Sequence, residues 1–170
     1  MRPAQRLKEL CIDYIVILGC LVLLALVCAA FYGLVLGGVP EFSSTHTQLI
    51  VTLTSVAPII LLFSALDYRR PCGTIGKRRA GLMVAYRARA PWRALVRNAV
   101  KFMPWQLAHI GVIDGVYTEF DHPVSLIVIW AGLGLLFVLL GMRLLRADGR
   151  HLGDMLAGTQ VVPVGSTITP

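Results

Sequence analysis

Charged residues are missing from long stretches of this 170-residue chain. Residues 49–66 and 124–142 contain none, and residues 12–36 contain a single one, Asp13. Each stretch is about as long as a helix must be to cross roughly 30 Å of hydrocarbon. A soluble fold could not bury three such segments in so short a chain. The sequence therefore predicts an integral membrane protein.

Motifs for metal binding, disulfide pairing and catalysis are also missing. The 4 cysteines form no C-x-x-C pair, so neither a zinc site nor a disulfide framework is expected. No serine lies in a nucleophile elbow, and no H-E-x-x-H or suitably spaced acid pair occurs. Gly76-Lys77 does not belong to a phosphate loop, because Pro71 replaces its first glycine and Arg78 its Ser or Thr. We therefore expect no enzymatic activity, no metal and no cofactor.

Acidic residues are scarce, with 9 Asp and Glu against 16 Lys and Arg and a net charge of +7. The basic residues have few aromatic residues among them and form no nucleic-acid-binding module, so we expect no nucleic-acid partner. In membrane proteins, Lys and Arg collect on the cytoplasmic side and meet anionic lipid. Here all 16 fall in blocks at 2–8, 69–101 and 143–150. The predicted partner is the bilayer, with anionic lipid at its cytoplasmic face.

The positions of these blocks predict how the chain crosses the membrane. Residues 37–48 carry no Lys or Arg, which predicts a cytoplasmic N-terminus and an external first loop in the plasma (inner) membrane. Three crossings would leave Arg143, Arg146 and Arg150 outside, whereas a further, weakly apolar crossing places every basic block and the C-terminus in the cytoplasm. We favour four crossings over three, in an all-α helical bundle that forms one domain, 1–170. The predicted spans are 12–36, 49–66, 99–117 and 124–142.

Local patterns predict packing within this bundle. Ala25, Ala29, Gly33 and Gly37 recur every four residues, a spacing that lets helix backbones approach closely, and we expect them to pack inside the chain. Residues 82–86 and 160–162 are β-prone and could pair at the cytoplasmic face. A short helix is expected at 151–156, with Gly158 ending it.

Charged residues near the ends of the chain are the main candidate site. Asp13 is costly at the edge of a membrane helix, so it needs a partner or a function. Arg6 is about two helical turns away, roughly 10 Å, which is too far for a direct pair. We expect Asp13 to pair with Arg97 or Lys101, and Asp154 to pair with Arg6. These groups either hold the termini and the central segment together as ion pairs or form a site where a proton and a cation compete.

Further polar residues have simpler interpretations. Lys77, Arg78 and Arg79 are expected to lie at the lipid headgroups or to face a partner. Asp67 is expected to lie at the membrane interface. His109 is either a proton relay or a histidine satisfied by a neighbour.

Several motifs follow one another in a specific order. Arg6 precedes Asp13, T-I-G-K at 74–77 precedes G-L-M-V at 81–84, Arg97 follows, and D-M-L-A-G-T-Q-V-V stands at 154–162. Together they resemble the RDD family of small membrane proteins, named for one arginine and two aspartates. Met155 stands where the family pattern has a further arginine. The resemblance implies a helical domain, usually described with three spans, and a signature made of Arg6, Asp13 and Asp154.

Two functions remain open. Ion transport or exchange has been proposed for some RDD proteins, so the resemblance agrees with transport of an ion or small solute. A homo-oligomer is then expected, because four short helices barely enclose a path. The alternative is a binding or assembly factor whose basic cytoplasmic loop recruits a partner or anionic lipid.

Overall fold

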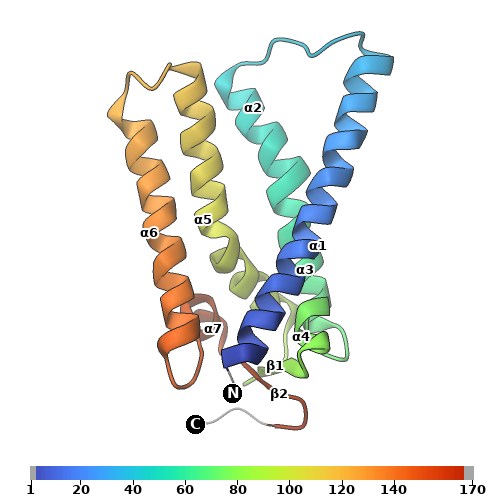
Figure 1. Cartoon of the computed structure of the whole chain (residues 1–170), viewed down its shortest axis with the longest axis vertical. Coiled ribbons are helices and arrows are strands. Elements are labelled where there is room, and N and C mark those ends of the chain that lie inside the picture. Colours follow the sequence, from blue (N-terminus) through green and yellow to red (C-terminus); the bar gives the residue numbers. More distant parts are fainter. Residues whose placement is uncertain (1–2, 167–170) are drawn as a thin grey trace.

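The computed structural model describes residues 3–166, which form a mostly helical protein with one small sheet (Figure 1). Arg2 lies outside the described residues. So does residue 170, which the charge pattern places on the cytoplasmic side. The first half of the chain contains α1 (Pro3–Ala30), η1 (Phe31–Val35), α2 (Ser44–Val51), η2 (Thr52–Val56), α3 (Ala57–Tyr68), α4 (Ile75–Arg79) and β1 (Leu82–Tyr86). The second half contains α5 (Pro91–Tyr117), α6 (Pro123–Leu145), α7 (Leu152–Ala157) and β2 (Thr159–Pro163).

Three helical segments are long and apolar enough to cross a membrane: Ala4–Val35, Ser44–Tyr68 and Pro123–Leu145. Candidate membrane-spanning helices thus coincide with three of the predicted spans, although the first helix begins well before residue 12. Its first turns are polar, yet they are helical because they pack at one end of the molecule.

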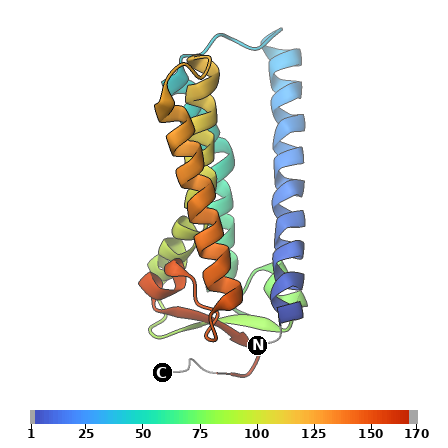
Figure 2. The same ribbon diagram turned by 60° about the vertical axis from the view of Figure 1, so that its left-hand side comes forward.

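Helix α5 is not among these candidate spans, and its first half carries Arg93, Arg97 and Lys101. It nevertheless runs alongside α6 for most of the length of the bundle (Figures 1 and 2). A Cβ at Gly111 would lie 2.7 Å from the Ser125 carbonyl oxygen, and one at Gly132 would lie 2.9 Å from that of Pro104. Glycines therefore allow the two backbones to approach closely. The fourth crossing stays a prediction.

The two strands pair antiparallel at one end of the bundle, as the β-prone segments predict. Leu82 pairs with Pro163 and Tyr86 with Thr159. We call this end the sheet end, and the opposite end, with loops at 36–43 and 118–122, the loop end (Figure 1). Helix α7 leads into β2 and ends, as predicted, at Gly158, whose φ of 61° lies in the left-handed region that glycine adopts without strain.

Helix α1 stands apart from the other long helices toward the loop end (Figure 2). None of its most apolar window is buried, and a Cβ at Gly33 would meet nothing within 4 Å. The prediction that the small-residue stripe packs inside the chain is therefore wrong. α1 leans away from its neighbours, so within the described residues the stripe is exposed. The main packing partner of α1 is α4, at the sheet end.

Candidate functional site

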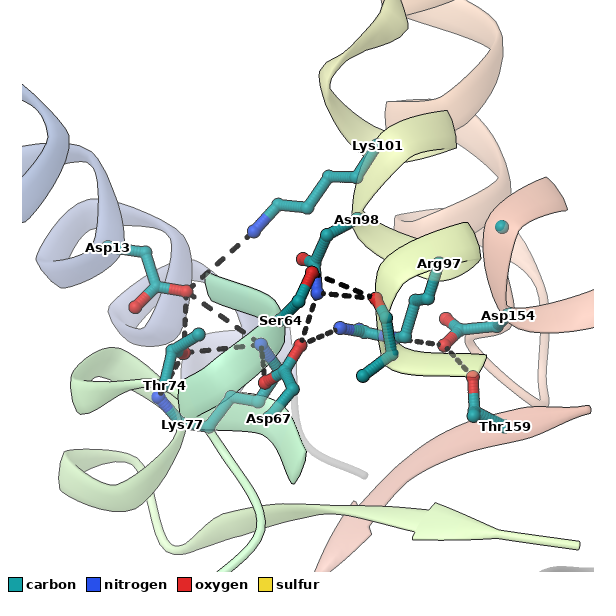
Figure 3. Close-up of polar contacts among 12 residues, drawn as sticks. Asp13, Ser64, Asp67, Thr74, Lys77, Arg97, Asn98, Lys101, Asp154 and Thr159 are labelled. Carbon is teal, nitrogen blue, oxygen red and sulfur yellow. Dashed lines mark hydrogen bonds and ion pairs between the residues drawn. The ribbon is translucent and has the colours of Figure 1, made fainter. Parts of the chain in front are cut away.

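The sheet end contains a buried network of ion pairs, which we call the charge cluster. Its members come from α1, α3, α4, α5, α6 and α7. Figure 3 labels members on each of these helices except α6. The acids and bases are equal in number, so the cluster has no net charge when all are ionised. Its members are Glu9, Asp13, Asp67 and Asp154 with Lys77, Arg97, Lys101 and Arg143.

Asp13 binds the first turn of α4. Its Oδ2 accepts a hydrogen bond from the Thr74 hydroxyl at 2.7 Å, and its Oδ1 accepts one from the Gly76 backbone N–H at 2.9 Å. A Cβ at Gly76 would lie 2.6 Å from Asp13 Oδ1, so only glycine allows this approach. The T-x-G-K motif thus supplies the hydrogen-bond donors that bind Asp13, the first aspartate of the signature. Lys101 Nζ lies 3.8 Å from Asp13 Oδ2. Lys101 is one of the two partners that the sequence predicts for Asp13.

Lys77 is fully buried and connects three elements. Its Nζ lies 3.4 Å from Glu9 and 3.2 Å from Asp67, and it also donates to the Thr74 hydroxyl at 3.2 Å. The prediction that Lys77 lies at the headgroups is therefore wrong. The short helix α4 turns this one side chain inward, whereas its neighbours Arg78 and Arg79 are exposed.

Arg97 occupies the other half of the cluster. Its Nε donates to Asp154 at 2.6 Å, and its Nη1 donates to Asp67. All three side chains are buried, so each charge is neutralised by direct contact. Asp67 was expected at the membrane interface; instead Lys77 and Arg97 pair with it in the interior, and Asn98 donates to it at 3.1 Å.

The predicted pairing of Asp154 with Arg6 is wrong. Asp154 pairs with Arg97 and accepts from the Thr159 hydroxyl at 2.9 Å. Arg6 instead donates to the carbonyl oxygens of Arg143 at 2.7 Å and Leu144 at 3.3 Å. A cation is favourable there because the last carbonyls of a helix lack intrahelical partners. Arg6 therefore ties the start of α1 to the end of α6.

His151 caps the N-terminus of α7, and its pKa is lowered. His151 accepts from the Gly153 N–H at 3.0 Å, and burial, opposed by the charge of Asp154, lowers the pKa of His151 to about 4. Burial raises the pKa of Asp154, but the charge of Arg97 outweighs it and holds that pKa well below its usual range. At neutral pH this end of the cluster thus holds a neutral imidazole beside an ionised carboxylate.

His109 does not belong to the cluster. It lies farther along α5, where it accepts a hydrogen bond from the Trp105 indole N–H at 3.2 Å. Trp105 is thus a neighbour of the kind required by the interpretation of His109 as a histidine satisfied within the protein. Within residues 3–166, no group of His, Cys, Asp and Glu is arranged to hold a metal ion.

A cavity of about 520 Å³ lies above the cluster, between α1 and the pair α5–α6. Glu9, Asp13, Lys101 and Arg143 form its polar base. Its walls are apolar and include Ile17, Leu21, Trp105, Leu133, Leu136 and Leu140. The arrangement is a charged base under an apolar chamber, next to a helix whose main packing partner is α4.

Sequence reasoning missed Glu9, Arg143 and the burial of Asp67. Glu9 pairs with Arg143 at 2.5 Å and with Lys77. One signal could have found it: Glu9 and Asp13 are four residues apart and so share a face of α1. No comparable signal marks Arg143, which ends an apolar helix as an interfacial arginine would.

The fold and this site define a helical membrane protein whose sheet end is fixed by a buried, neutral ion-pair network. The model of the RDD family matches residues 2–158, so the chain belongs to the RDD family. No curated protein matches the chain significantly, and neither does any solved structure.

Proposed function

We propose that the protein is a multi-pass transporter of an ion or small solute, and not an enzyme. The cavity between α1 and α5–α6, with the charge cluster at its base, is the observation that carries this proposal. Ligand pockets of roughly 300–1,000 Å³ lie preferentially between the helices of bundles. Charged groups inside a membrane domain are rare, and they mark solute and ion pathways.

The cluster itself holds the sheet end closed in this proposal. Two ion pairs have both partners in the lining of the cavity: Asp13–Lys101 is the longer at 3.8 Å, and Glu9–Arg143 measures 2.5 Å. A cation that enters the cavity competes with Lys101 for Asp13, and a proton does the same. Most ion pairs of the charge cluster thus hold the sheet end together, as the structural interpretation requires. The Asp13–Lys101 pair can exchange its cation, as the ion-site interpretation requires.

Four crossings and an N-terminus in the cytoplasm of the inner membrane complete the proposal. Helix α5 packs along α6, and a helix in such contact with a membrane span occupies the same layer. Both ends of the described chain lie at the sheet end (Figure 1), as an even number of crossings requires. Exposed Arg78 and Arg79 would then meet anionic lipid, and a homo-oligomer would complete the path.

Cysteine labelling tests the crossings. In a chain with its own cysteines replaced by alanine, we expect Glu41→Cys and Asp121→Cys to react with an impermeant maleimide on intact cells. Ser166→Cys should react only after permeabilisation. Protection of Asp121→Cys together with external labelling of Ser166→Cys would establish three crossings.

Flux into proteoliposomes tests transport. With purified protein and a panel of monovalent cations and small solutes, we expect uptake that Asp13→Asn reduces at least about tenfold, since the exchanging carboxylate is lost. Asp121→Asn is the matched control, because it makes the same chemical change at an exposed loop position. Uptake equal to that of protein-free vesicles would reject transport, and full uptake by Asp13→Asn would remove Asp13 from the mechanism.

Recruitment of a partner or anionic lipid is the second candidate function, and exposed Arg78 and Arg79 favour it. The test is affinity capture from native membranes with Arg78→Glu/Arg79→Glu. Lys77 must stay unchanged, because reversing its charge would disrupt the cluster rather than the surface. An unchanged set of captured partners and lipids would count against this function.

A further inference from the structure

The cavity at the charge cluster is built for a ligand with an apolar body. Leucines of α6 and apolar residues of α1 face each other across it, and Trp105 of α5 contributes a further wall. α1 packs mainly on α4, and the cavity beside it is partly open rather than enclosed. Because the walls of the cavity are apolar, they suit a ligand that enters from the bilayer rather than from water.

The base of the cavity selects the charge of the other end of that ligand. The side chain of Lys101 is 22% exposed, whereas those of Glu9 and Asp13 are 3% and 4% exposed. Arg143 is 6% exposed and already binds Glu9. Among the charged groups that line the cavity, the accessible one is thus a cation.

Lys101 is also the most weakly held member of the cluster. Its ammonium lies 3.8 Å from Asp13, which is beyond hydrogen-bond distance, and 4.8 Å from the centre of the Phe63 ring. Figure 3 shows the side chain extending from α5 toward Asp13. An ammonium can donate three hydrogen bonds, so this group has capacity for a ligand.

We propose that the cavity binds a long-chain fatty acid, with its carboxylate on Lys101 and its chain between α1 and α6. A ligand with one negative charge can share the Lys101 ammonium with Asp13, and Glu9 and Asp13 repel it less than they would repel a phosphate dianion. A volume of about 520 Å³ suits one chain better than a two-chain lipid. The inference rests on the proposed function, because it names the solute of the same cavity.

Tryptophan quenching by a fatty acid brominated in mid-chain tests the inference. Trp105 lines the cavity, whereas Trp130 is 68% exposed on the outer surface of α6. In full-length protein in detergent with Trp92→Phe and Trp130→Phe, we expect saturable quenching of Trp105. In the reporter with Trp92→Phe and Trp105→Phe, quenching of Trp130 should rise with the probe and not saturate.

Lys101→Met should raise the half-saturating concentration at least about tenfold, since a charge-assisted hydrogen bond is lost. Lys8→Met, at an exposed position on α1, should leave it unchanged. A brominated alcohol of the same length should bind at least about tenfold more weakly to protein that retains Lys101. This comparison keeps the inference falsifiable if Lys101→Met does not fold.

Quenching of Trp105 that never saturates, or that is equal for alcohol and acid, would overturn the inference. The proposed function fails separately. Saturable acid binding without flux of any ion or solute would leave the fatty-acid site and reject transport, whereas cation flux without saturable quenching would do the reverse.

Discussion

The sheet end and the loop end of this protein are held together by different forces. At the sheet end, six helices meet through buried ion pairs, and Lys77, Asp67 and Asp154 have no exposed surface. Toward the loop end, α1 is exposed along its apolar stretch and Gly33 touches no other segment. Because lipid solvates apolar helices as well as another helix does, apolarity alone does not draw α1 onto the bundle.

The difference teaches where rigidity is placed. Buried charges tolerate little displacement, since the loss of one partner leaves the other unpaired in a low-dielectric interior. An apolar helix surrounded by lipid loses little when it moves. The base of the cavity is therefore held by ion pairs, whereas the wall that α1 forms toward the loop end has few packing contacts.

The largest expected effect comes from removing the central arginine of the fixed end. Arg97→Leu leaves Asp67 and Asp154 buried without their main cation, and we expect a loss of about 3–5 kcal/mol in the free energy of unfolding. Thermal unfolding of the purified protein in detergent measures it. Arg87→Leu, an exposed arginine after β1, is the control and should change stability by less than about 0.5 kcal/mol. Equal melting of both variants would show that the cluster does not stabilise the sheet end.

Acid should weaken the sheet end through His151. Its folded pKa of about 4 lies below the roughly 6.5 of an unfolded chain, so the unfolded state takes up the proton first. The stability that this group contributes is complete above about pH 6.5 and is lost as the pH falls toward 4, by about 3 kcal/mol. Melting temperatures between pH 7 and 4 measure the loss. His151→Asn keeps an N-cap acceptor without a titrating ring and should flatten this part of the profile; an unchanged slope would assign it to other groups.

A pair of glycine variants compares the two regions directly. Gly76→Ala places a methyl group against Asp13 and should destabilise the protein by about 1–3 kcal/mol, as overpacking does. Gly33→Ala adds the same methyl group to α1 where nothing lies within 4 Å, so the expected change is below about 0.5 kcal/mol. Thermal unfolding of both variants is sufficient. A larger loss from Gly33→Ala would mean that the small-residue stripe packs against a helix of another chain.

The spans could be predicted because hydropathy is a property of each segment by itself. The strand pair at Leu82–Tyr86 and Thr159–Pro163 was also within reach, since both segments are β-prone and follow basic, turn-rich connections. Arg6, Asp13 and Asp154 could be chosen as buried candidates because charges near membrane helices are costly.

The partners of these residues could not be predicted in the same way. Lys77, Arg78 and Arg79 look alike in sequence, and only the orientation of a five-residue helix decides that the first is buried and the others exposed. Asp154 had two cationic segments within reach, and the position of α7 against α5 selected Arg97 over Arg6. The small-residue spacing on α1 indicates where a helix could pack, but not whether a partner helix is there.

The positions of the partners of Arg97 along the chain set an order for biogenesis. Asp67 precedes it by 30 residues, and Asp154 follows it by 57. A ribosome adds roughly 5–20 residues each second, so α5 waits several seconds after its own synthesis before α7 emerges. Until then Arg97 has half of its carboxylate partners, and β1 has no strand to pair with. Helix α7 and β2 therefore complete the partners of Arg97 and of β1 only after the earlier helices have been synthesised.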